Sequence, residues 1–385
     1  MLNRKIIKKV APEAGKPLLA RLIEASPRKH KEDSMSTSPG PINLFEFEDL
    51  AKERLPKEEY DYIAGGATDE ISVERNRRAF ESWALRPRVL RDVSALDLST
   101  TVLGTKVSLP VLIAPCGGHK RAHPEGESAT YRAATACGTI FAVSAHSNTS
   151  FEELAKAATG HLWLQLYPFH DREMTKSWLR RAKAAGYEAI CVTLDSQWPP
   201  KRERNIRNNY KRTRGINFAE PAPGQTPAPS GADPAATWKD LEWIKSETDL
   251  PVAAKGIMTG EDVELCAQVG ADAVVVSNHG GRHLDNTLAT IEVLSEAVAA
   301  AKGGMEILLD GGIRRGADAV KALALGAKAV FIGRPLFWGL AVAGEQGVIQ
   351  VLDILREEIE ITMAKCGRPT IASIDSTVIV KAPRL

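Results

Sequence analysis

Residues 306–335 read EILLDGGIRRGADAVKALALGAKAVFIGRP, and their pattern gives the clearest indication of the fold. An apolar run with β propensity passes through a Gly-Gly turn into an Ala- and Leu-rich segment with helical spacing, and then into a second apolar run. A strand, a helix and a second strand in this order form two parallel strands joined by a right-handed crossover. The stretch therefore predicts one β-α-β unit of an α/β protein.

The same alternation recurs through most of the chain. We count eight short β-rich runs, and a helical pattern clearly follows seven of them. The predicted strands are VLIAP (111–115), IFAVSA (140–145), LWLQLY (162–167), AICVTLD (189–195), PVAAKG (251–256), AVVVSNHG (273–280), EILLDGG (306–312) and AVFIGRP (329–335). Eight such units in roughly 250 residues predict a (β/α)₈ TIM barrel. An open doubly wound sheet is the alternative, but VLIAPCGGHKR after the first strand lacks its GxGxxG fingerprint.

Three segments depart from the barrel pattern. Residues 1–41 are predicted to be a disordered or extended tail, either a solvated basic flank or a contact for a membrane surface or partner. Residues 42–385 are predicted to form the barrel domain, which begins with a cap of two short helices broken at Pro56 and ended by Gly65–Gly66. After the fourth strand, a Pro- and Ala-rich loop over about 196–236 is predicted to be a lid, and Thr237 then caps the next helix.

The bulk composition excludes several function classes. Fifty Lys and Arg against 48 Asp and Glu give a net charge of +2, which does not favour nucleic acid as a partner. Five cysteines without a CxxC pair indicate neither a disulfide framework nor a metal site. No apolar run is long enough for membrane insertion, and the N-terminus has no sustained apolar core typical of a secretory signal. We therefore expect a cytoplasmic protein that acts on a small molecule.

Polar residues follow the predicted strands at the barrel end where catalytic groups gather. The strand ends in chain order carry Ser144, Gln165, Tyr167, Thr193, Asp195, Lys255, Ser277, His279, Asp310 and Arg334. Arg314 and Arg334 lie in glycine-bearing turns after the last two strands, a pattern typical of a phosphate site, although each turn could also be a tight turn with a solvated arginine.

A buried lysine at position 255 needs an anionic partner. A reduced flavin ring supplies one, and a structural salt bridge is the alternative. Ser144, Gln165, Thr193 and Ser277 are short hydrogen-bonding residues that suit the edge of a flat heterocycle.

His279 is the candidate general base, since a histidine takes up a proton near neutral pH and Asp195 could orient its ring. Arg282 and Arg202 offer two guanidinium groups with the geometry that binds a carboxylate.

These residues resemble the FMN-dependent 2-hydroxy acid oxidase and dehydrogenase family, which includes glycolate oxidase, lactate oxidase and mandelate dehydrogenase. The resemblance runs almost collinearly from about Leu44 to Ile374. The motifs that carry it are YDYIAGGA (60–67), AHPEGE (122–127), LQLY (164–167), TLDS (193–196), SNHGGRHLD (277–285), LLDGGIRRGADAVKALALGA (308–327) and FIGRP (331–335).

The resemblance implies a homotetramer that holds FMN, oxidises an L-2-hydroxy acid to the 2-keto acid and passes electrons to O₂ or another acceptor. It implies that His279 is the catalytic base paired with Asp195, that Arg202 and Arg282 bind the substrate carboxylate, and that Tyr62 and Tyr167 contact substrate. The implied cofactor residues are Pro115, Cys116, Gly117, Ser144, Gln165, Thr193, Lys255, Ser277, Asp310, Gly312, Arg314, Gly333 and Arg334.

Three positions depart from the family pattern. Many members have Gln at His283 and a Thr-Ala pair at Cys116–Gly117, and glycolate-type members have Trp at His146. The segment SAHSNTSFEEL (144–154) looks more like the lactate oxidase branch. A smaller imidazole, with room left opposite it near Gly117, predicts L-lactate or a related acid as substrate, unless His146 faces solvent without such a role. A glycolate- or mandelate-type specificity is the alternative within the family.

Two alternatives lie outside the family. A barrel of the inosine monophosphate dehydrogenase kind needs a nucleophilic loop cysteine, which the late-strand loops do not supply. A non-catalytic flavin- or metabolite-binding barrel has no use for His279 with Asp195.

Overall fold

The computed structural model describes residues 40–211, 214–218 and 231–383. The predicted tail, apart from Gly40 and Pro41, and residues 212–213 and 219–230 of the predicted lid therefore lie outside the described residues. The described residues from Pro41 onward belong to one compact unit.

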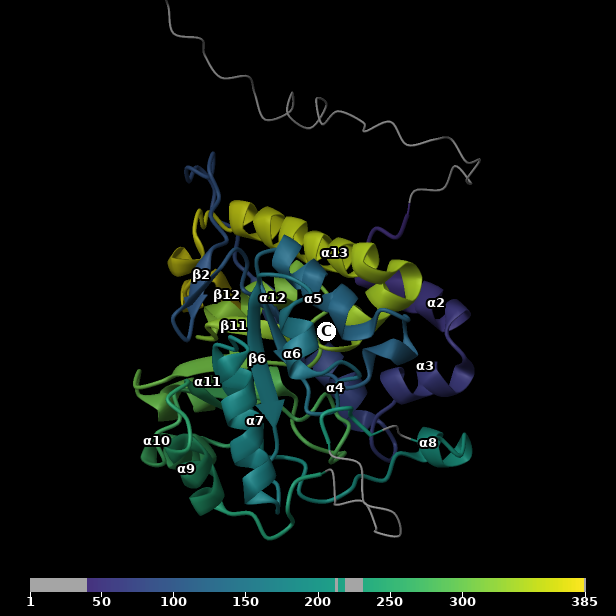
Figure 1. Cartoon of the computed structure of the whole chain (residues 1–385). Helices are drawn as coiled ribbons and strands as arrows, with labels where there is room; N and C mark the ends of the chain where they lie inside the picture. Colours follow the sequence, from purple (N-terminus) through teal and green to yellow (C-terminus); the bar gives the residue numbers. More distant parts are fainter. Residues whose placement is uncertain (1–39, 212–213, 219–230, 384–385) are drawn as a thin grey trace, which may run out of the picture. The chain divides into compact units, whose positions relative to one another are not determined.

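Eight parallel strands close into a barrel, which confirms the predicted fold (Figure 1). The strands are β4 (Val111–Ile113), β5 (Ile140–Val143), β6 (His161–Leu166), β7 (Ala189–Thr193), β8 (Val252–Ile257), β9 (Ala273–Val276), β10 (Glu306–Leu309) and β11 (Ala329–Ile332). They pair in sequence order, and β11 closes the ring by pairing with β4. Most of their residues are fully buried, as expected for strands covered on both faces.

The strand register sets polar residues at a common height. Thr193 at the end of β7 lies opposite Lys255 on β8, and Gln165 on β6 lies opposite Cys191 on β7. A register shift between Lys255 and Ile257 marks a bulge in β8. Side chains from neighbouring strands therefore converge at the carboxyl end of the barrel.

A hairpin of β2 (Thr100–Val102) and β3 (Thr105–Val107) covers the other end of the barrel. Val102 and Val107 belong to the same apolar cluster as the barrel-interior residues Trp163 and Phe331. The backbone N–H of Leu103 donates to Glu306, the first residue of β10. This end is therefore filled by packed side chains.

A helix follows each barrel strand. These helices are α5 (Gly126–Ala136), α6 (Phe151–Ala155), α7 (Arg172–Ala184), α9 (Trp238–Ser246), α10 (Gly260–Gln268), α11 (Thr290–Ala301), α12 (Gly316–Ala324) and α13 (Arg334–Lys365). Thr237 caps α9 as predicted, and its backbone N–H donates to Asp240 at 2.8 Å. Within the described ranges, no helix has the length and apolar character needed to cross a membrane.

The N-terminal cap contains α2 (Leu44–Arg54) and α3 (Lys57–Ala64), separated at Pro56 and ended at Gly65 as predicted. The Asn43 side chain caps α2 by accepting from the backbone N–H groups of Phe45 and Glu46. A third helix, α4 (Ile71–Arg78), follows and was not predicted. Helix α2 packs along α13, so the cap is tied to the last helix of the barrel (Figure 1).

Candidate active site

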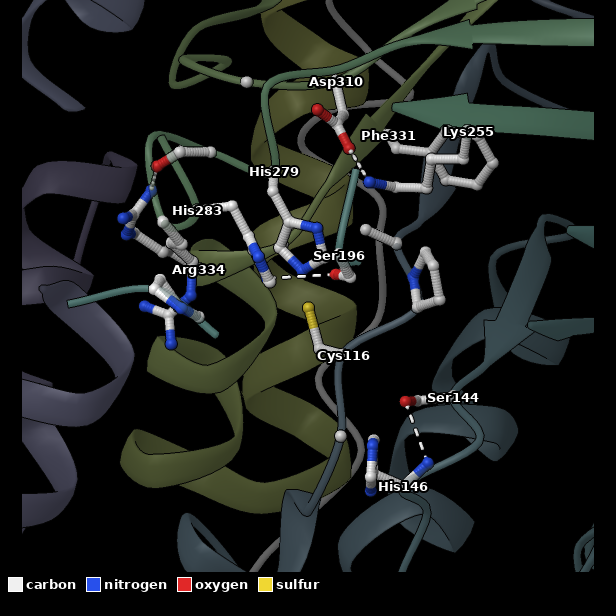
Figure 2. Close-up of a pocket in the computed structure, with 18 of the residues that line it drawn as sticks. Cys116, Ser144, His146, Ser196, Lys255, His279, His283, Asp310, Phe331 and Arg334 are labelled. Atoms are coloured by element: carbon white, nitrogen blue, oxygen red, sulfur yellow. Dashed lines mark hydrogen bonds and ion pairs between the residues drawn. The ribbon is translucent and has the colours of Figure 1, made fainter. Parts of the chain in front are cut away.

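A cavity of about 500 Å³ opens at the carboxyl end of the barrel, within the size range of ligand-binding pockets. Sixteen of the twenty predicted site residues line it: Tyr62, Pro115, Cys116, Gly117, Ser144, His146, Tyr167, Arg202, Lys255, His279, Arg282, Asp310, Gly312, Arg314, Gly333 and Arg334. The other four are Gln165, Thr193, Asp195 and Ser277. Gln165, Asp195 and Ser277 are hydrogen-bonded to the lining residues Ser144, His279 and Lys255, and Thr193 is hydrogen-bonded to Gln165. Figure 2 shows part of this wall.

His279 follows β9 and holds an uncommon left-handed backbone conformation, with φ at 55°. Its Nδ1 lies 2.9 Å from Oδ1 of Asp195, which follows β7. Burial raises the pKa of Asp195, while the charge of Lys255 opposes this shift. With Nδ1 directed at Asp195, Nε2 is the ring nitrogen of His279 that a reactant can approach.

Gly256 in the β8 bulge makes room for this pair. A Cβ at position 256 would lie 2.7 Å from Cβ and Cγ of Asp195, and its φ of +104° disfavours other residues. The bulge therefore lets the Asp195 carboxylate pass over β8 toward His279.

The predicted ring-binding residues are linked to one another by hydrogen bonds. Nε2 of Gln165 donates to the hydroxyl of Thr193 at 3.0 Å, and its Oε1 accepts from the hydroxyl of Ser144 at 3.2 Å. Nζ of Lys255 donates to the hydroxyl of Ser277 at 2.8 Å. These contacts fix the orientation of the strand-end side chains at the base of the cavity.

Lys255 forms a buried ion pair with Asp310, with 2.9 Å between Nζ and Oδ2. Burial disfavours the ammonium, but the charges of Asp310 and Asp195 raise the pKa of Lys255 above its usual value. Oδ1 of Asp310 has no hydrogen-bond partner among the described residues. Lys255 therefore forms the salt bridge that was the alternative to a flavin contact. Because Lys255 and Asp310 both line the cavity, the same pair can also interact with a bound ligand.

Arg314 and Arg334 lie in the cavity wall, and neither forms an ion pair with a carboxylate among the described residues. Arg334 donates to the backbone carbonyls of Gly65 and Gly280, each at 3.0 Å. Desolvation lowers the pKa of Arg314 to about 10, and desolvation together with the charge of Arg282 lowers the pKa of Arg334 to about 9. A bound phosphate would supply the negative charge that these two groups need.

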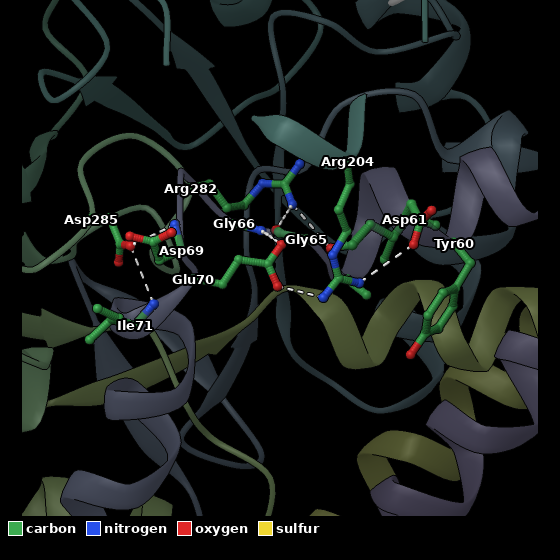
Figure 3. Close-up of polar contacts among 12 residues, drawn as sticks. Tyr60, Asp61, Gly65, Gly66, Asp69, Glu70, Ile71, Arg204, Arg282 and Asp285 are labelled. Atoms are coloured by element: carbon green, nitrogen blue, oxygen red, sulfur yellow. Dashed lines mark hydrogen bonds and ion pairs between the residues drawn. The ribbon is translucent and has the colours of Figure 1, made fainter. Parts of the chain in front are cut away.

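The N-terminal cap supplies Tyr62 from α3. The guanidinium of Arg121 lies 4.2 Å from the centre of the Tyr62 ring, and the Tyr210 ring stacks on the Tyr62 ring with 4.7 Å between the ring centres. Nη1 of Arg282 donates to the carbonyls of Ile63 and Gly65 at the end of the same helix (Figure 3). The end of α3 thus forms one side of the site.

The loop after β7 is attached to the cap by ion pairs. Its short helix α8 (Glu203–Arg207) packs on α3, and Arg204 pairs with Glu70 and Asp61 (Figure 3). The loop residues Trp198 and Ala232 line the cavity. The described parts of the predicted lid therefore lie beside the site, whereas its closing role stays a prediction.

Asp285, the last residue of SNHGGRHLD, was not predicted to matter. Its carboxylate accepts from the backbone N–H groups of Asp69, Ile71 and Ser72, at 2.7 Å for Ser72 (Figure 3). Burial opposes ionisation, but hydrogen bonds from the backbones of Ser72, Asn286 and Ile71 and from the Thr68 side chain lower the pKa of Asp285 to about 2. Asp285 anchors the loop that carries His279 to the start of α4, and its place within the motif is the signal that could have identified it.

His146 is buried, with 4% of its surface exposed, which excludes the solvent-facing alternative. Its ring lies 5.9 Å from the Tyr167 ring and 5.2 Å from the Phe218 ring. Gly117 lies against His146, since a Cβ at position 117 would lie 2.8 Å from Cβ of His146, and both residues line the cavity.

Comparisons with known proteins identify the family to which this barrel belongs. A family model described as FMN-dependent dehydrogenase matches residues 51–381. A peroxisomal (S)-2-hydroxyacid oxidase from Arabidopsis thaliana is 47% identical over 343 residues, which cover 86% of this chain and 94% of that protein. An L-lactate oxidase from Nostoc sp. is 45% identical over 363 residues, which cover 90% of this chain and 100% of that protein.

Solved structures agree with these relatives. A mandelate oxidase in complex with 3,3-difluoro-2-hydroxy-3-phenylpropionic acid is 39% identical, with a TM-score of 0.82 over 90% of this chain and 100% of that chain. The chain belongs to the FMN-dependent dehydrogenase family. The predicted cofactor, FMN, and the predicted oxidoreductase activity are thereby confirmed, and the relatives named above are 2-hydroxy acid oxidases.

The cavity fits this cofactor on structural grounds. Arg314 and Arg334 line the cavity and form no ion pair with a carboxylate among the described residues, although the charge of Glu48 acts on both. A flavin phosphate would supply the anion that these two buried guanidinium groups favour, and Lys255, paired with Asp310, would add a cation for a reduced flavin ring.

Proposed function

We propose that this chain oxidises an L-2-hydroxy acid with His279 as the general base, and the pairing of His279 with Asp195 carries the proposal. FMN, when bound, supplies the two-electron acceptor for the substrate. His279 takes up the substrate proton at Nε2, because Nδ1 is held by Asp195. The carboxylate of Asp195 stabilises the imidazolium that results and keeps the ring in one orientation.

Arg282 and Arg202 bind the substrate carboxylate in this proposal. Both line the cavity, and Nε of Arg202 donates to the backbone carbonyl of Arg282 at 3.1 Å. The contacts of Arg282 with Ile63 and Gly65 hold its guanidinium plane in place. Two guanidinium groups fixed in this way match the two oxygens of a carboxylate. Tyr62 and Tyr167 complete the substrate side of the pocket.

The cofactor residues divide by their chemistry. Lys255, Ser144, Gln165, Thr193 and Ser277 would hydrogen-bond the flavin ring, and the hydrogen bonds among them would keep their side chains oriented for it. The ribityl and phosphate groups would be held by Asp310, Gly312, Arg314, Gly333 and Arg334, and Pro115, Cys116 and Gly117 would provide the backbone edge after β4.

The proposed substrate is L-lactate or a somewhat longer 2-hydroxy acid. The buried imidazole of His146 occupies less volume than an indole in the cavity wall, and one relative is an L-lactate oxidase. A methyl group accommodated in an apolar pocket changes kcat/KM by about 10–200-fold. We expect a preference for L-lactate over glycolate within this range.

The test compares kcat/KM for glycolate and L-lactate in the wild type, in His146→Trp and in His161→Trp. His161 lies at the start of β6, at the opposite end of the barrel from the cavity, and so provides a matched control. The wild type and His161→Trp should favour L-lactate, and His146→Trp should narrow or reverse that preference. An unchanged ratio in His146→Trp refutes the assignment.

Three further properties are part of the proposal. Electrons pass to O₂ or another acceptor in this proposal, which the names of the oxidase relatives support. Parallel assays of O₂ consumption and dye reduction would identify the acceptor.

The proposed oligomeric state is a homotetramer, and light scattering on the purified protein tests it. A cytoplasmic location is testable by cell fractionation, and the competing result is a peroxisomal location, which the name of the Arabidopsis relative gives for that protein.

A further inference from the structure

His283 lies in the cavity wall beside the proposed base. Its ring centre is 4.1 Å from that of His279, and the two planes are inclined by 53°. The residue comes from the loop after β9, yet its polar contacts reach across to the loop after β7. Figure 2 shows its contact with Ser196. The proposed catalytic, substrate-binding and cofactor-binding roles leave His283 unused.

The hydrogen bonds of His283 determine which ring nitrogen carries the proton. Nε2 lies 3.1 Å from the hydroxyl of Ser196 and 3.4 Å from Nη2 of Arg202. A guanidinium group can only donate, so the contact with Arg202 requires an unprotonated Nε2 on His283. The proton of the neutral ring then resides on Nδ1, which is buried and has no hydrogen-bond partner among the described residues.

Its surroundings keep this ring uncharged. Arg202 faces it from the loop after β7, and Arg282 and His279 face it from its own loop. Burial is the largest influence, and with these three groups it lowers the pKa of His283 to about 2, although Asp195 opposes the shift. A neutral imidazole acceptor is consequently available to Arg202 throughout the range in which such an enzyme works.

We propose that His283 is a positioning residue that holds the Arg202 guanidinium for the substrate carboxylate. The neutral acceptor at Nε2 orients Nη2 of Arg202, and the ring packs against His279. The inference rests on the proposed role of Arg202 and adds a reason why a second histidine stands next to the base. It predicts that the hydrogen-bond acceptor of His283, rather than its ring, sets the affinity for carboxylate ligands.

Two substitutions separate the acceptor from the ring. His283→Gln keeps an oxygen that can accept from Arg202 and removes the ring. His283→Phe keeps a ring of similar size against His279 and removes the acceptor. His161→Phe makes the same change at the opposite end of the barrel and serves as the control. Melting temperature and FMN absorbance verify that each variant is folded and loaded.

The readouts are KM and kcat for L-lactate and the inhibition constant of oxalate, a dicarboxylate. His283→Phe should raise KM and the oxalate inhibition constant about tenfold, the effect of one hydrogen bond to a charged group, with a much smaller change in kcat. In His283→Gln, both constants should lie within about threefold of the wild-type values, and His161→Phe should leave them unchanged. Equal losses in the Phe and Gln variants, or no loss in the Phe variant, would overturn the proposal.

Arg202→Met distinguishes failure of this inference from failure of the proposed function. If Arg202→Met weakens oxalate and His283→Phe does not, the inference about His283 alone is wrong. If Arg202→Met binds oxalate as tightly as the wild type, the proposed role of Arg202 fails first and the inference falls with it.

Discussion

Nδ1 of His279 lies 2.9 Å from Oδ1 of Asp195, although 84 positions separate the two residues in the chain. They follow β9 and β7, and β8 runs between these strands. The contact exists because the β8 bulge places Gly256 beneath the Asp195 side chain. The orientation of the proposed base is therefore a property of three adjacent strands of the barrel.

Asp195→Asn tests this orientation. An amide has nearly the same shape as the carboxylate but cannot stabilise an imidazolium by charge, so we expect flavin reduction to slow by about 10²–10⁴. FMN should stay bound, because Asp195 contacts His279 and has no proposed role in holding the cofactor. Anaerobic stopped-flow spectroscopy with L-lactate measures the rate, and a rate within about threefold of the wild type would exclude the role.

Lys255→Met tests the buried ion pair. The side chains of Lys255 and Asp310 are 5% and 11% exposed, so removing the ammonium leaves a buried carboxylate without its counterion. Breaking such a pair costs about 3–5 kcal/mol in the free energy of unfolding. Urea denaturation should show this loss, and the double variant Lys255→Met with Asp310→Asn should recover part of it. A double variant no more stable than the single one would argue against the pairing.

Arg282→Met should weaken substrates mainly through their carboxylate. We expect kcat/KM for L-lactate to fall by an amount equivalent to about 2–5 kcal/mol if the pair is desolvated. Arg207→Met is the matched control, since Arg207 is 75% exposed and pairs only with Glu203 among the described residues. The carboxylate assignment is wrong if the steady-state kinetics of Arg282→Met match those of the control.

Asp285→Asn should destabilise the fold in a pH-dependent manner. The folded pKa of about 2 lies below the usual value of about 3.9, so the stabilisation is complete above pH 4 and is lost as the pH falls from about 4 towards 2. At pH 7 we expect a loss of about 1–3 kcal/mol in the free energy of unfolding, from hydrogen bonds to the carboxylate. Urea denaturation at pH 7 and pH 3 measures the difference in the free energy of unfolding between the wild type and Asp285→Asn, which should be smaller at pH 3. The same difference at both pH values would contradict the role of the Asp285 carboxylate.

The barrel was predictable because it is specified by local patterns. Runs such as AVVV in β9 are apolar on both faces, and the segments between the runs have helical spacing. The site followed from topology, since parallel strands in a closed barrel bring Lys255 and His279 to the same end.

The remaining features depend on contacts between distant loops. Asp285 matters because α4 lies against its loop, and α4 was not predicted. The stacking of Tyr210 on Tyr62 depends on the path of the loop after β7. The close approach of Gly117 to His146 joins the loops after β4 and β5 and could not be read from either segment alone. No local pattern in the sequence contains these distances.

His279→Gln gives the most direct test of the central claim, that His279 accepts the substrate proton. Purified His279→Gln, loaded with FMN, is mixed with saturating L-lactate in the absence of O₂, and flavin bleaching is followed in a single turnover. We predict that FMN remains bound and that the bleaching rate falls by at least about 10²–10⁴, because the base is lost. Bleaching at a rate close to that of the wild type would contradict the account.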